Sequence, residues 1–147
     1  MANPDRSDFM ETLEWNANYA TGIPEIDAQH SYLFELANRF IRGLNSLPDP
    51  VAQRQLLAEL TSYTQRHFTF EEKCMEEASY PHLAEHHASH QRLRVQLARF
   101  ASEVESGRLE PREFAQFLRN WLKLHVLRED MRYIPTLTTT EDRDGNA

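Results

Sequence analysis

Residues 67–90 read HFTFEEKCMEEASYPHLAEHHASH, and this stretch decides the fold. It contains two polar pairs at four-residue spacing, His67 with Glu71 and His86 with His90. On a helix, positions four apart differ by about 40° in rotation and about 6 Å in height, so both members of a pair can aim at one point. Tyr80-Pro81 separates the pairs, and proline both lacks a backbone N–H and restricts the residue before it. The stretch therefore predicts two helices joined by a short turn.

Prolines and apolar spacing extend this interpretation to the rest of the chain. Pro24, Pro50 and Pro111 suit helix starts, and apolar residues recur behind each of them at three- and four-residue spacing. We predict four helices, over residues 24–46, 50–78, 81–106 and 111–133. Connections this short force neighbouring helices to run antiparallel. The expected fold class is therefore all-α, an up-down-up-down antiparallel four-helix bundle.

The chain divides into three parts on this interpretation. Residues 23–135 form the bundle, and residues 136–147 read as a polar C-terminal tail. Residues 1–22 form an N-terminal arm, which Trp15 and Tyr19 could pack against the bundle. No internal repeat or second domain is visible, and the 147 residues suit a single domain.

Composition narrows the class of protein. The formal net charge is -7 and no basic run is present, so we expect no nucleic-acid partner. No run approaches the roughly 18 apolar residues of a membrane span, and the N-terminus lacks the apolar core of a signal peptide. The single cysteine, Cys74, cannot form an internal disulfide, which fits a reducing compartment. We expect a soluble cytoplasmic protein.

Distances along the chain from each turn place seven polar residues at one height in the bundle. His30 lies 18 residues before Pro48, and His67 lies 19 residues after it. Because antiparallel helices share the same rise per residue, equal separation from a turn means nearly equal height. The same comparison about Tyr80 and Arg108 completes the layer. It contains His30, His67, Glu71, His86, His90, His125 and Asp130.

This layer indicates a metal site. Five imidazoles and two carboxylates in an apolar core would be prohibitively costly without a compensating cation. Seven ligands exceed what one ion takes from protein, whereas two ions bridged by both carboxylates use them all. Three histidines then serve one ion and two the other, which keeps a position for a small ligand. Iron fits better than zinc, calcium or magnesium, while copper and nickel also suit imidazole.

The nitrogen-rich shell also bears on function. Oxygen-activating di-iron bundles use mostly carboxylates, with Glu-x-x-His pairs. Five neutral ligands and only two anions favour reversible binding of O2 over cleavage of the O–O bond.

His82 offers an alternative register for the third helix, because it forms a second HxxxH pair with His86. It lies two residues past Tyr80, far from the height of Glu71, so we assign the pair to His86 and His90. His87 is rotated about 100° from His86 and is expected to face water.

Three other residues near the layer have structural explanations that we prefer. Asp27 stabilises the first turn of its helix. Glu72 is adjacent to Glu71 and is expected to point to solvent. Cys74 packs in the core, since a thiol would duplicate a complete set of ligands.

At these residues the chain resembles the hemerythrin family, in particular its single-domain bacteriohemerythrins. The matching stretches are GIPEIDAQH (22–30), HFTFEE (67–72), Tyr80-Pro81 followed by His86-x-x-x-His90, and WLKLH with Asp130 (121–130). They cover nearly the whole bundle, and the resemblance implies an oxo- or hydroxo-bridged pair of iron ions that binds O2.

The family's ligand positions carry over residue by residue. They imply His86, His90 and His125 on one iron, His30 and His67 on the other, and Glu71 and Asp130 across both. O2 would bind at the iron that carries His30 and His67. By position, Trp121, Leu122 and Val126 are candidates for the apolar wall of the O2 pocket.

Three classes of function are compatible with these features. We prefer a non-enzymatic O2-binding protein for oxygen storage, delivery or buffering. The second class is an O2 or redox sensor that acts through a separate, unidentified protein partner. The third is a di-iron enzyme, such as a ferroxidase or an NO or peroxide reductase, and it ranks lowest because no nucleophile, general base or substrate cleft is apparent beyond the metals.

Overall fold

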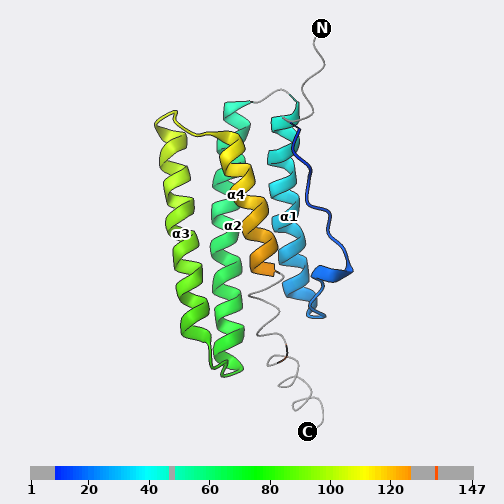
Figure 1. Cartoon of the computed structure of the whole chain (residues 1–147). Coiled ribbons are helices and arrows are strands. Elements are labelled where there is room, and N and C mark those ends of the chain that lie inside the picture. Colours follow the sequence, from blue (N-terminus) through cyan, green and yellow to red (C-terminus); the bar gives the residue numbers. More distant parts are fainter. Residues whose placement is uncertain (1–8, 47–48, 127–134, 136–147) are drawn as a thin grey trace.

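The computed structural model describes residues 9–46, 49–126 and 135. Within these residues the chain forms a short 3-10 helix, η2 (Ala17–Tyr19), and four long helices. They are α1 (Pro24–Asn45), α2 (Pro50–Glu77), α3 (Leu83–Glu105) and α4 (Pro111–Leu124). Figure 1 shows the four helices side by side along one direction, with α1 against α2 and α4, and α2 against α3. The predicted antiparallel four-helix bundle is confirmed.

Proline starts three of the four helices, as the sequence predicts. Pro24, Pro50 and Pro111 each occupy the first turn, where a missing N–H costs no hydrogen bond. Asp49 also caps α2, because its side chain accepts a hydrogen bond of 3.0 Å from the N–H of Val51. At the C-terminal end of α3, Gly107 adopts a φ of 71° and terminates the helix.

The prediction that the third helix begins at Pro81 is wrong by two residues. Ser79 takes a positive φ of 56°, and the N–H of Tyr80 donates back to the carbonyl of Met75 at 2.9 Å. This closing turn of α2 uses the residues that would otherwise start the next helix. Pro81 therefore lies in the reversal, and α3 begins at Leu83.

The fourth helix is described only in part. Regular α4 ends at Leu124, and His125 and Val126 continue it in a wider π-type turn. The predicted extension to residue 133 and the polar tail at 136–147 lie outside the described residues.

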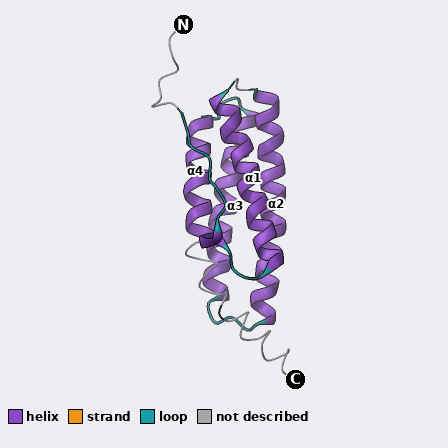
Figure 2. Cartoon of the chain, turned by 90° about the vertical axis from the view of Figure 1, so that its right-hand side faces the viewer, coloured by secondary structure: helices purple, strands orange, loops and turns teal. Residues whose placement is uncertain are grey.

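The described part of the arm, residues 9–22, runs along α1, as both views show (Figures 1 and 2). Trp15 stacks on Tyr19 with ring centroids 5.6 Å apart, and both rings meet Phe34 of α1 edge-on, at 5.3 and 4.9 Å. The expectation that these two aromatic residues pack the arm against the bundle is confirmed.

Two apolar clusters fill the bundle. The larger includes Phe34, Phe68 and Phe100. The smaller consists of Ile26, Met75 and Tyr80, near the start of α1 and the end of α2, with Cys74 packed against it as expected. His30 and Glu71 of the polar layer lie four residues, about one helical turn, from Ile26 and Met75 of the smaller cluster. In the part of the chain that the structure describes, no helix is long and apolar enough to cross a membrane.

Candidate metal centre

The bundle brings six of the seven predicted ligands into one buried cluster. They are His30 from α1, His67 and Glu71 from α2, His86 and His90 from α3, and His125 directly after α4. None of the six is more than 7 % exposed. Asp130, the seventh, lies outside the described residues. The six side chains therefore lie at one height in the bundle, as their equal separations from the turns along the chain predict.

Glu71 lies at the centre of the cluster. Its Oε1 contacts Nε2 of His67 and lies 2.9 Å from Nε2 of His125 and 3.9 Å from Nε2 of His30. Its Oε2 faces the other side, 3.5 Å from Nε2 of His86. One carboxylate therefore meets imidazoles of all the elements that build the site.

The donor atoms fall into two sets, each compact enough for one cation. The first set is His30, His67, Glu71 and His125, and the second is His86, His90 and His125. Within each set the donor atoms lie within 4.8 Å of one another. His125 belongs to both sets, which places it at their junction.

Burial keeps the charge of this cluster low. Desolvation lowers the pKa of His67, which favours the neutral form of the ring, the form that ligates metals. Burial alone would raise the pKa of Glu71, but His67 and His125 outweigh it and hold that pKa well below its usual range. Imidazole nitrogens around an ionised carboxylate suit a cation such as iron, whereas calcium prefers sites built from oxygen ligands.

Aromatic rings fix the planes of two of the histidines. Phe68 stacks on His90 with centroids 3.7 Å apart and an interplanar angle of 9°. Trp121 stacks on His125 at 5.0 Å and 19°. Leu122 and Val126, the other two residues predicted for the O2 pocket, are fully buried in the larger apolar cluster.

Gln29 is a contact that sequence reasoning missed. Its Oε1 lies 2.7 Å from Nδ1 of His67, so it can accept a hydrogen bond from Nδ1–H. This hydrogen bond leaves Nε2 of His67 directed at Glu71. The only sequence signal was its place beside His30, within a stretch already matched to the family.

The structure also distinguishes the competing interpretations of His82, at the N-cap of α3, and His87 within α3. His82 is 55 % exposed and pairs with Glu85 at 3.5 Å, so it lies outside the cluster. His87 is half exposed, as expected, although its Nδ1 contacts Glu72.

The two acidic alternatives have different outcomes. Asp27 stabilises the entry to α1, because its carboxylate accepts hydrogen bonds from Thr21 and from the N–H of Gly22. The prediction that Glu72 points to solvent is wrong. Its side chain is 19 % exposed and lies among His87, His90 and Arg94, because α3 packs over that side of α2.

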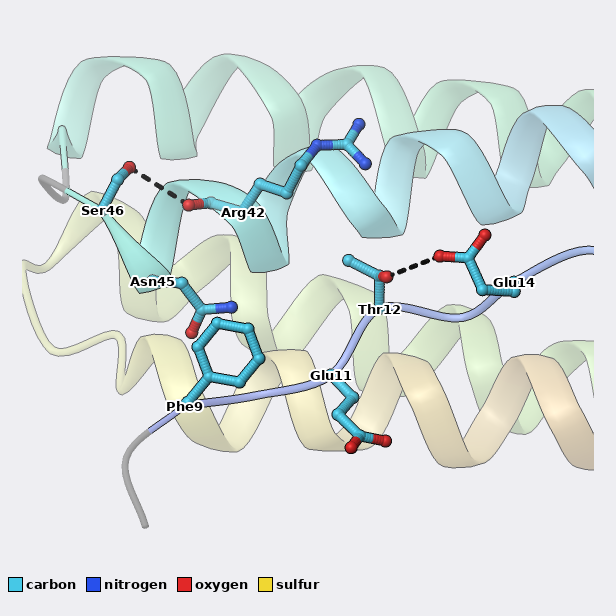
Figure 3. A pocket seen from close by; sticks show the side chains of 7 residues that line it. All are labelled: Phe9, Glu11, Thr12, Glu14, Arg42, Asn45 and Ser46. Atoms are coloured by element: carbon cyan, nitrogen blue, oxygen red, sulfur yellow. Dashed lines mark hydrogen bonds between the residues drawn. The ribbon is translucent and has the colours of Figure 1, made fainter. Parts of the chain in front are cut away.

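A surface pocket of about 440 Å³ lies elsewhere, between the arm and the end of α1 (Figure 3). Its lining residues are Phe9, Glu11, Thr12, Glu14, Arg42, Asn45 and Ser46. It contains none of the predicted ligands.

Comparison with known proteins agrees with this geometry. The family model described as the hemerythrin HHE cation binding domain matches residues 21–137. A bacteriohemerythrin of Stenotrophomonas maltophilia is 32% identical over 124 residues, covering 84% of this chain and 80% of that protein. Hemerythrin subunit alpha of Lingula anatina is 29% identical over 123 residues, covering 84% and 93%.

Solved structures give the same result. The crystal structure of a wild-type hemerythrin superposes with a TM-score of 0.79 at 27% identity, covering 85% of this chain and 97% of that one. A buried histidine–glutamate cluster inside a bundle of this shape, matched by the family model over most of its length, shows that the chain belongs to the hemerythrin family.

Proposed function

We propose that this protein binds O2 reversibly at two iron ions, for oxygen storage, delivery or buffering. The observation that carries the proposal is the division of one buried cluster into two sets of donors around Glu71. The ligands would be His30, His67, Glu71, His86, His90, His125 and Asp130. When bound, the iron pair supplies the electrons that O2 accepts on binding and returns on release.

The residues of the chain hold the ions and set their surroundings. Oε1 of Glu71 contacts His67 of the first set and Oε2 faces His86 of the second, so its single negative charge serves both positions. Gln29 accepts a hydrogen bond from Nδ1–H of His67, which keeps Nε2 of that ring available to a cation. Asp130 would supply the second shared carboxylate, as the family pattern implies.

Apolar residues would keep water from the O2 side of the centre. Leu122 and Val126 are fully buried, and Trp121 covers one face of His125. A dry wall favours release of O2 unchanged. Water or an external anion that entered the pocket would let the ligand leave as hydrogen peroxide, which would carry away the two electrons that the iron pair otherwise recovers.

No observation favours the sensor or the enzyme over this function. Proteins of this family in general bind oxygen rather than catalyse reactions. A carrier should hold O2 for minutes or longer, whereas an enzyme should consume O2 repeatedly when reductant is supplied. A protein partner and a cytoplasmic location stay predictions from the sequence.

Iron quantitation with an optical spectrum tests the proposal. The purified protein should contain two iron ions per chain. Its reduced form should be nearly colourless under nitrogen and gain a visible absorption band in air. One zinc ion, or one iron ion in a fully folded sample, would refute the dinuclear centre.

A further inference from the structure

Glu72 is a largely buried carboxylate next to the metal centre, although it is not one of the predicted ligands. It follows Glu71 on α2, and α3 covers it so that only 19 % of its side chain is exposed. Its Oε1 lies 3.5 Å from Nδ1 of His90. It therefore approaches the outer nitrogen of a buried imidazole whose other nitrogen, Nε2, can face the cluster.

Packing alone does not determine whether Nε2 of His90 or a ring carbon faces the cluster. Phe68 lies parallel to the His90 ring at 3.7 Å and so determines the plane of that ring. A rotation of 180° about χ2 keeps this plane and the stacking, because the final torsion of histidine is roughly two-fold. The rotation exchanges Nε2 with a carbon, and a carbon cannot bind metal. A polar group close to one ring nitrogen can distinguish the two orientations.

We propose that Glu72 is a positioning residue of the metal centre: by accepting the Nδ1–H of His90, it selects the ring orientation that aims Nε2 at the cation. The inference rests on the proposed function, because it takes His90 to be a ligand. Metal-bound histidines commonly donate their outer N–H to a carboxylate, which fixes both orientation and tautomer.

Two further residues hold Glu72 in this position. Nη2 of Arg94 lies 3.7 Å from Oε2 of Glu72, and Nδ1 of His87 contacts Oε1. Arg94 also lies over the Phe68 ring, with Cζ 5.2 Å from the centroid. Arg94 thus contacts both side chains that orient His90. Phe68 determines the plane of the His90 ring, and Glu72 determines which edge of the ring faces the cluster.

The test is anaerobic titration of the metal-depleted full chain with Fe(II) and, as a spectroscopic probe, Co(II). Three substitutions separate reach from charge: Glu72→Ala removes both, Glu72→Gln keeps the reach, and Glu72→Asp keeps the charge one methylene short. Glu76→Gln, one turn further along α2 and exposed, is the matched control. Denaturant unfolding of each metal-depleted variant verifies the fold.

We expect Glu72→Ala to weaken metal binding about 10- to 100-fold, the usual effect of losing such a partner. Glu72→Gln should bind more tightly than Glu72→Asp, since an amide oxygen can still accept from Nδ1–H. In a His90→Ala background, Glu72→Ala should have no further effect. The Co(II) absorption bands should change in Glu72→Ala and remain as in wild type in Glu76→Gln.

Failure of the inference differs from failure of the proposed function. If wild type binds two ions and Glu72→Ala binds them equally well, Glu72 does not position His90, while the metal centre stands. If Glu72→Asp binds more tightly than Glu72→Gln, charge rather than orientation is responsible, and the inference is also overturned. If wild type binds no metal, both fail. Since Gln and Asp are close in size to Glu, this comparison holds even if Glu72→Ala does not fold.

Discussion

The side-chain amide of Asn38 on α1 holds both backbone groups of Leu13 in the arm. Its Nδ2 donates to the Leu13 carbonyl at 2.8 Å, and its Oδ1 accepts from the Leu13 N–H at 2.7 Å. Two turns along α1, Asn45 holds Met10 in the same way, at 2.7 and 3.0 Å. The arm is thereby fixed to α1 at two points, and the pair at Leu13 is buried.

Substitution of Asn38 tests the attachment of the arm. Asn38→Ala leaves the N–H and C=O of Leu13 without these partners, which should lower the free energy of unfolding by about 1–3 kcal/mol. It should also expose Trp15 and Tyr19 to chymotrypsin under native conditions. Asn18→Ala, an exposed position in the same arm, is the control. Equal cleavage rates in the two variants would show that Asn38 does not hold the arm.

The carboxylates should govern assembly of the metal centre. Glu71→Ala removes the charge shared by both sets of donors, and the uncompensated cations should then bind poorly. Elemental analysis of the folded variant should find well under two iron ions per chain. Asp130→Ala should have a similar effect if the family pattern holds. Full iron occupancy in either variant would show that the two carboxylates are not both bridging.

Four alanine variants, one at the N-cap of α3 and three within it, test which histidines bind metal. His82→Ala and His87→Ala should retain wild-type iron content, because both side chains are at least half exposed and outside the buried cluster. His86→Ala and His90→Ala should lower the iron content. Loss of iron from His82→Ala together with retention in His86→Ala would assign the other register to this helix.

The apolar wall should control how long bound O2 survives. Leu122→Asn puts an amide into a fully buried position, admits water and should speed oxidation of the iron without removing it. The readout is the decay rate of the visible band in air, measured beside the iron content. Leu124→Asn makes the same change at a position that is 48% exposed and should decay as wild type does. Identical decay in both variants would place Leu122 outside the pocket.

The height of the polar layer could be predicted because the rise per residue is the same in every α-helix. Counting from each turn therefore related residues as distant as His30 and His125. The start of α3 could not be predicted in this way, because it depends on the left-handed conformation of Ser79. That conformation is uncommon for a residue other than glycine, and the composition of the turn does not signal it.

Contacts between side chains of different helices were harder to predict. Gln29 and Glu72 each sit beside a predicted ligand, and one position along a helix turns a side chain by about 100°. That rotation excludes both from ligating the same cation as their neighbours, but it lets each reach the outer nitrogen of a histidine on an adjacent helix. Likewise, nothing local marks Asn38 as the partner of a backbone 25 residues away.

The most direct test of the central claim is the stoichiometry and reversibility of O2 binding by the reduced, iron-loaded protein. Oxygen uptake would be measured together with iron content while the visible band is followed. We predict one O2 per two iron ions, with the band lost under vacuum or nitrogen and regained on readmission of O2. Continuous consumption of O2, or irreversible oxidation of the iron with no band, would contradict the account.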